Sequence, residues 1–62
     1  MWTVNNGRLY CGKDPVSVRR SVVEAVTGGA RGPISEETAR RMLRLERRLS
    51  LQGLAASLSR LA

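Results

Sequence analysis

Cys11 is the only cysteine of this chain, and the chain contains no histidine. A disulfide within the chain is therefore excluded, and a structural zinc site is not expected, because one thiolate cannot fill the tetrahedral shell of the metal. Small domains commonly use such cross-links, since a chain of about 60 residues buries only about 60% of its surface on folding. We expect residues 1–62 to form a single small domain that depends on helix packing or on a second subunit.

Residues 2–11 combine strand-forming side chains with a turn at Asn6-Gly7. Asn-Gly favours a two-residue type I′ turn, because both residues tolerate positive φ angles. We therefore predict an antiparallel β-hairpin over 2–11, which must pack on other elements because an isolated hairpin is marginal in water. The two aromatic residues, Trp2 and Tyr10, lie on opposite arms, where they contact each other or anchor the hairpin to the helices.

The segment 15–27 is predicted to be a helix, with Asp14 as its N-cap and Pro15 in its first turn. Its apolar residues cover one broad side of a helical wheel: Val18, Val22, Val23, Ala25 and Val26. The β-branched valines lower the helix propensity, so this helix should depend on packing. The glycine-rich segment 28–32 and the following Pro33 are interpreted as a turn, because the Lys-Ser/Thr ending of a phosphate-binding loop is missing.

A second helix is predicted over 35–49, with Ser35 as its N-cap and two glutamates in its first turn. Ion pairs are expected between Glu36 and Arg40 and between Glu37 and Arg41, because these residues are four positions apart. The inward face should carry four residues: Thr38, Met42, Leu45 and Leu49.

The last apolar set, which we call the leucine stripe, consists of Leu51, Leu54, Leu58 and Leu61. On one continuous helix, this stripe lies nearly opposite Met42, so the helix either presents two faces or breaks. We predict a bend or break at Ser50–Gly53, because Ser50 can cap a new helix and Gly53 weakens a continuous one. A helix, or a continuation after the bend, then covers 51–61. The expected fold is mainly α: an N-terminal β-hairpin followed by two or three helices, assembled as a homodimer through the leucine stripe.

The chain lacks the residues that most catalytic and metal sites need. It has no Cys-His or Ser-His pair, and its few carboxylates stand beside arginines at helical spacing. We therefore expect no enzymatic activity, no cofactor, no metal and no small-molecule substrate. No membrane contact is expected, because the most apolar stretch, 51–62, is short and interrupted by polar residues. A lone cysteine without a targeting signal is typical of the cytoplasm.

Positive charge is in strong excess: Lys and Arg total 11 against 5 Asp and Glu, a net charge of +6. All but Lys13 are arginines, whose guanidinium groups make bidentate contacts with phosphate and carboxylate. Such an excess indicates an acidic partner, either nucleic acid or an acidic protein. Four arginines of the segment 35–49 recur at three- and four-residue spacing and form what we call the arginine ridge: Arg40, Arg44, Arg47 and Arg48. The ridge suits phosphate binding, but a merely solvated helix face would have the same composition.

The segment 17–42, SVRRSVVEAVTGGARGPISEETARRM, resembles the second half of a Cro/repressor-type helix-turn-helix domain. In that family, the recognition helix ends at a glycine-containing turn, and the next helix opens with a similar I-S-x-E-x-A-R-R run. The resemblance covers 26 of the 62 residues, and a predicted hairpin stands where the family has its first two helices. It implies that Ser17, Arg19, Arg20 and Ser21 face bases and phosphates, and that Ile34 and Ala39 are core residues.

Two functional hypotheses follow. The leading one is a small, basic regulatory protein that binds nucleic acid through Arg19 and Arg20 or through the arginine ridge. The alternative is a protein–protein interaction module, such as a small phage-encoded adaptor or inhibitor, that docks through the leucine stripe. The exposed functional surface would be basic in the first case and apolar in the second.

Overall fold

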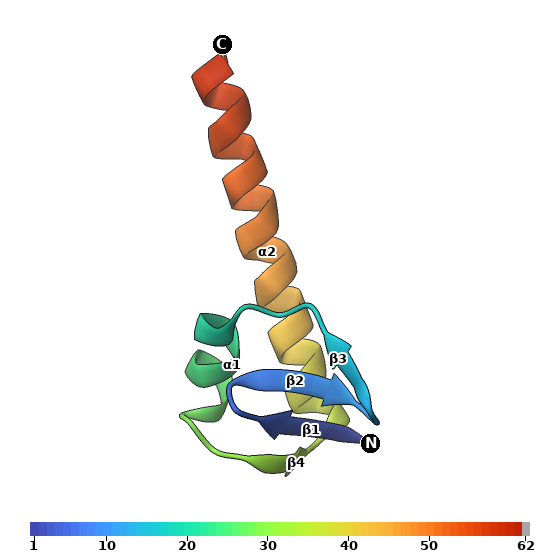
Figure 1. The fold of residues 1–62 in the computed structure, drawn as a ribbon. Coiled ribbons are helices and arrows are strands. Elements are labelled where there is room, and N and C mark those ends of the chain that lie inside the picture. Colours follow the sequence, from blue (N-terminus) through green and yellow to red (C-terminus); the bar gives the residue numbers. More distant parts are fainter. Residues whose placement is uncertain (62) are drawn as a thin grey trace.

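The computed structural model describes the backbone of residues 1–61 and the side chains of residues 1–59. Four strands and two helices follow one another as β1 (Trp2–Asn5), β2 (Arg8–Cys11), β3 (Asp14–Val16), α1 (Arg20–Thr27), β4 (Gly32–Ile34) and α2 (Glu36–Leu61). The fold is therefore mixed α/β, with an N-terminal hairpin as predicted but within a larger sheet (Figure 1). The expected fold is confirmed in part: the hairpin and two helices are present, but the four-stranded sheet makes the fold mixed α/β rather than mainly α.

The predicted hairpin is present. Strands β1 and β2 are antiparallel, and Asn6 and Gly7 between them have φ angles of 52° and 74°, as a type I′ turn requires. Trp2 lies opposite Cys11, whereas Tyr10 lies opposite Thr3. Because successive residues of a strand point to opposite faces, the two aromatic side chains lie on opposite faces of the sheet. Trp2 packs against the core, so its role is to anchor the hairpin rather than to contact Tyr10.

Two further strands extend the hairpin into an antiparallel sheet with the order β3-β2-β1-β4. The prediction of a helix starting at Pro15 is wrong, because Asp14–Val16 pairs with β2 and places Val16 opposite the buried Leu9. Each edge strand has three residues and a central proline, Pro15 in β3 and Pro33 in β4. A proline offers no N–H group, and a short edge strand leaves little backbone to pair, so neither edge suits the addition of a strand from another chain.

The first helix, α1, begins at Arg20 and ends where the sequence predicts. Gly28 adopts the left-handed conformation with a φ of 65°, and its N–H group donates to the carbonyl oxygen of Glu24 at 2.8 Å. Val22 and Val23 are buried, whereas Ala25, predicted on the same side, is exposed. The apolar side of α1 is therefore narrower than the sequence suggests.

The second helix, α2, runs without interruption through its 26 residues, so the predicted break at Ser50–Gly53 is wrong. The Ser50 hydroxyl donates to the Glu46 carboxylate one turn earlier, at 3.3 Å, and therefore does not cap a new helix. The space beside Gly53 is open, so its cost is only that of a glycine in an exposed helix, about 1 kcal/mol. At its start, the helix is capped as predicted, because the Thr38 N–H group donates to the Ser35 hydroxyl at 3.1 Å.

The core lies between one face of the sheet and the two helices. It is formed by Val4, Leu9, Val22, Val23, Ala39 and Met42, with the partly buried Leu45 and Leu49 beside it on α2. This confirms the predicted inward face of the second helix up to Leu49. Beyond Leu49, α2 extends away from the sheet (Figure 1), and the molecule measures 44 × 21 × 19 Å. Along the described part of the chain, no helix has the length and apolar character that crossing a membrane requires.

Candidate nucleic-acid interface on the long helix

The outward side of α2 joins the arginine ridge to the leucine stripe. At 3.6 residues per turn, successive residues are about 100° apart, so Leu51 lies about 180° from the buried Met42. Arg44 and Arg47 lie within about 40° of Leu51 around the same axis. Because α2 is continuous, the basic and the apolar residues form one face, which points away from the sheet and α1.

The arginines at the centre of this face have no acidic partner within the described part of the chain. Arg44, Arg47 and Arg48 are exposed, and none of the ion pairs between described residues includes them. Arg40, the fourth member of the ridge, contacts Glu36 at 3.2 Å. Both side chains of that pair are about two-thirds exposed, at 68% and 67%, and such a pair is weak enough to exchange for a phosphate. The predicted pair between Glu37 and Arg41 is not among the ion pairs of the described residues.

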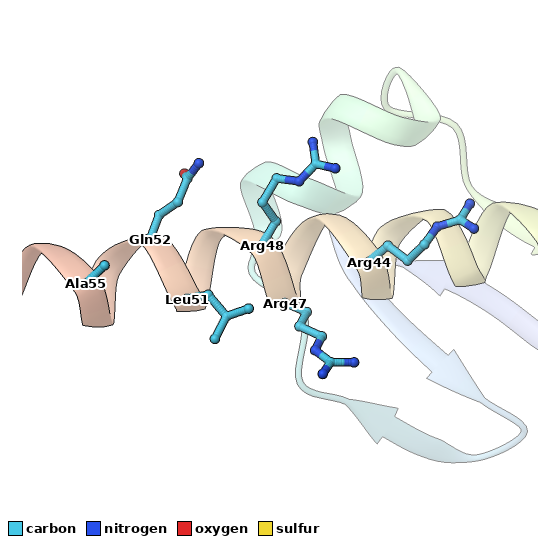
Figure 2. Close-up of a pocket in the computed structure, with 6 residues that line it drawn as sticks. All are labelled: Arg44, Arg47, Arg48, Leu51, Gln52 and Ala55. Atoms are coloured by element: carbon cyan, nitrogen blue, oxygen red, sulfur yellow. The ribbon is translucent and has the colours of Figure 1, made fainter.

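A shallow, open hollow lies on α2 where the basic and apolar residues meet. It is lined by Arg44, Arg47, Arg48, Leu51, Gln52 and Ala55 (Figure 2). The guanidinium groups of Arg47 and Arg48 diverge to opposite sides of the helix in this view, and Leu51 lies next to Arg47 (Figure 2). The hollow therefore offers several separated cationic groups rather than one enclosed site, which suits an extended polyanion better than a single small anion.

Arg19, which the sequence suggested for nucleic-acid contact, is instead bound to Glu46 on α2. Its backbone N–H group donates to Glu46 Oε1 at 2.7 Å, and its Nε and Nη2 groups donate to the same carboxylate at 3.0 and 2.8 Å. This hydrogen bonding lowers the pKa of the Glu46 carboxyl and raises that of Arg19. The pair joins the residue before α1 to the middle of α2, so the Arg19 side chain already has a structural role.

Arg20, the other arginine suggested near α1, contacts Glu24 at 3.2 Å and lies over the hairpin turn. Its Nε atom is only 2.7 Å from where a side-chain carbon on Gly7 would be. Glu46, which holds Arg19, is about 160° around α2 from Arg44. The structure therefore brings the arginine ridge together on one face and does not bring Arg19 into it.

The described part of the leucine stripe is exposed. Leu51, Leu54 and Leu58 have 57%, 58% and 59% of their surface accessible, and the side chain of Leu61 lies outside the described residues. The ridge and the stripe are each visible in the sequence, but that they share one face follows only from the continuity of α2. The regular spacing from position 40 to position 58 indicates this shared face, but the expected break at Ser50 obscured it.

Among the described residues, no group of three or more Cys, Asp or Glu side chains is placed to hold a metal ion. Cys11 is a free, exposed thiol.

The segment that resembles a helix-turn-helix domain, 17–42, contains α1, the strand β4 and the beginning of α2. A function shared with that family stays a prediction. The chain matches no protein-family model, no curated protein and no solved structure.

Proposed function

We propose that the protein binds nucleic acid through the outward face of α2, with Arg44, Arg47 and Arg48 contacting phosphate groups. One observation carries this proposal: these three arginines lie within an arc of about 100° on the exposed side of α2 and have no acidic partner among the described residues. Cations left unpaired within a domain are free to displace the counterions that surround a nucleic acid, and that displacement drives binding.

The shape of this face supports the same function. An α-helix with its side chains is about 10–12 Å across, which matches the width of the major groove of B-DNA, about 12 Å. Arg40 and Arg48 are eight residues apart, so the ridge extends about 12 Å along the axis of the helix. Guanidinium groups spread over this length can reach phosphates on both sides of a groove. Arg19 and Arg20 are not needed for this mode, because Glu46 binds Arg19 and because Arg20 lies on α1 rather than on the outward face of α2.

The test is a titration of labelled 20-base-pair DNA with the protein at several salt concentrations. For three phosphate contacts, the logarithm of the binding constant should fall with the logarithm of the salt concentration with a slope of about −2.7. This corresponds to about a 40-fold loss of affinity between 50 and 200 mM salt. The variant Arg44→Ala/Arg47→Ala/Arg48→Ala should lose most of the affinity and most of the slope.

A matched control removes the same number of charges elsewhere. Arg8, Lys13 and Arg31 are exposed and lie on the sheet or its connections rather than on α2. The variant Arg8→Ala/Lys13→Ala/Arg31→Ala should keep the salt dependence. Equal losses in both triple variants would show that only the net charge matters. Absence of binding at 50 mM salt to duplex DNA, single-stranded DNA and duplex RNA would reject the proposal.

A protein-interaction module is the second candidate, and the exposed leucine stripe is the observation that favours it. Three leucines at helical spacing on an exposed helix form the type of surface that lies in the apolar groove of a partner. If the protein acts only as an interaction module, Leu54→Asp should abolish binding to the partner protein, and the triple arginine variant should keep that binding. Loss of DNA binding in the triple arginine variant supports nucleic-acid binding instead.

A further inference from the structure

We propose that α2 pairs in parallel with α2 of a second copy of this chain, and that the pairing takes place on nucleic acid rather than in the free protein. This inference rests on the proposed function and adds the assembly state of the bound form. Three features of α2 carry it: the spacing of its outward residues, the short length of its leucine stripe and the position of its arginines.

The outward residues of α2 follow the spacing of a two-stranded coiled coil. From Arg40, the face continues at steps of four, three, four, three and four residues: Arg44, Arg47, Leu51, Leu54 and Leu58. Alternating steps of three and four residues define the a and d positions of a heptad repeat, at which two helices meet. Three members of the arginine ridge, Arg40, Arg44 and Arg47, therefore occupy the part of this seam that precedes the leucine stripe. The core residue Met42 is on the opposite side of α2, so the rest of the molecule does not block this seam.

The leucine part of the seam is short for a stable homodimer. It runs from position 51 to position 61, about one and a half heptads and about 15 Å. Coiled coils are recognised from three to four sustained heptads, and stable interfaces bury at least about 1,200 Å². The exposed leucines therefore favour pairing but are too few to hold two copies together at micromolar concentration.

The arginine part of the seam opposes pairing in the free protein. In a parallel pair, Arg44 and Arg47 of one copy would stand next to the same residues of the other copy, and like charges at these positions repel. The phosphate groups of one duplex, contacted by the arginines of both copies, reduce that repulsion. Nucleic acid and the second copy should therefore bind cooperatively, because each improves the site of the other.

Parallel orientation follows from the position of the charges. The leucine part gives no orientation signal, because the flanking Ser50, Ala55 and Ser57 carry no charge. In a parallel pair, the two arginine ridges are at the same end and diverge around one nucleic acid. In an antiparallel pair with the same leucine overlap, the two copies of Arg44 would be about 36 Å apart along the axis. The parallel pair places both ridges on the same phosphate groups of a duplex, whereas the antiparallel pair would need two contact points about one helical turn apart.

The first experiment measures assembly by sedimentation, with and without a 20-base-pair duplex at 50 mM salt. We expect a monomer at 20 µM without DNA and two copies per duplex, bound cooperatively, with DNA. Leu54→Asp/Leu58→Asp should keep the binding of one copy and lose cooperativity, with an apparent affinity reduced at least tenfold. Ala56→Asp/Ser59→Asp is the matched control, because it adds the same charge away from the seam and should keep two cooperative copies.

The second experiment tests the orientation with a cysteine at position 51 in a Cys11→Ser background. In a parallel pair, Leu51→Cys places two thiols side by side, and mild oxidation in the presence of DNA should join the copies. In the antiparallel pair, the same residues are about 15 Å apart along the axis, beyond the Cα separation of about 7 Å that a disulfide spans. Ala56→Cys, on the other side of α2, should not cross-link in either case.

The outcomes separate this inference from the proposed function. A stable dimer without nucleic acid, or duplex binding by single copies without cooperativity, would overturn the inference and leave the proposed function standing. Cooperative pairs that fail to cross-link through position 51 would overturn the parallel orientation. No binding to nucleic acid at 50 mM salt would overturn both.

Discussion

Arg19 and Glu46, 27 positions apart in the sequence, join the residue before α1 to the middle of α2 through a backbone and a side-chain contact. The backbone N–H group of Arg19 is 2.7 Å from Glu46 Oε1, and its Nη2 group is 2.8 Å from Oε2. Arg19 precedes α1, and none of the hydrogen bonds between described residues caps this helix through the Arg19 side chain. The carboxylate of Glu46 therefore satisfies a free N–H group at the start of α1 and fixes α1 against α2 at the same time.

The stability of the fold should depend on the charge of Glu46. Hydrogen bonds from Arg19 lower the pKa of this carboxyl below its ordinary value of 4.5. A group whose pKa is lower in the folded state stabilises the fold above the pKa of the unfolded state, and this contribution is lost as the pH falls through the folded pKa. We expect the melting temperature to fall below about pH 4.5, and Glu46→Gln to melt lower at pH 7 with a weaker dependence on acid.

Glu24→Gln is the control for this experiment. Glu24 also pairs with an arginine, Arg20, but its side chain is 56% exposed and it holds residues of a single helix. Glu24→Gln should change the melting temperature little, both at pH 7 and in acid. An acid dependence that is the same in the wild type and in Glu46→Gln would show that other carboxylates control the pH response.

The core should depend strongly on Met42. This side chain is fully buried between the sheet and the helices, so Met42→Ala leaves a cavity and should cost about 2–5 kcal/mol of unfolding free energy. Leu54→Ala removes a similar volume from an exposed site and should cost less than about 0.5 kcal/mol in the monomer. Urea denaturation followed by circular dichroism measures both values. A cost for Leu54→Ala as large as that for Met42→Ala would contradict the exposed position of the leucine stripe.

The continuity of α2 can be tested at Gly53. The space beside this residue is open, so an added methyl group meets no other atom. In a continuous helix, Gly53→Ala should stabilise the protein by about 0.5–1 kcal/mol and increase its helical circular dichroism, because alanine loses less backbone entropy on helix formation. A loss of stability, or no change in helix content, would indicate that the chain bends at this position.

A glycine-to-alanine substitution in the hairpin turn should have the opposite effect on stability. Gly7 has a φ of 74°, and a side-chain carbon there would meet the Arg20 side chain at 2.7 Å. Gly7→Ala should therefore destabilise the fold by about 1–2 kcal/mol, the cost of the left-handed conformation for alanine. Arg20→Ala combined with Gly7→Ala separates the two causes: it relieves the contact and leaves the backbone cost. If Gly7→Ala alone is neutral, the turn is not of the type described.

The sequence by itself determined the features that depend on neighbouring residues. Asn6-Gly7 specified the hairpin turn, Gly28 ended α1, and Ser35 capped α2. Helical periodicity placed Met42 on the buried face. Each of these rests on local backbone preference or on the repeat of one element, so a few consecutive residues carry the information.

Only the tertiary structure decided the features that depend on distant residues. Asp14 and Pro15 favour the start of a helix locally. Asp14–Val16 nevertheless forms β3, because β2 provides backbone hydrogen-bond partners and because Val16 packs against the core. Gly32–Ile34 becomes a strand for the same reason, beside β1. The hydroxyl group of Ser50, which could cap a new helix, instead donates to the Glu46 carboxylate. Arg19 holds that carboxylate in place. Local propensities are worth less than about 1 kcal/mol per residue, so pairing and burial contributed by distant residues outweigh them.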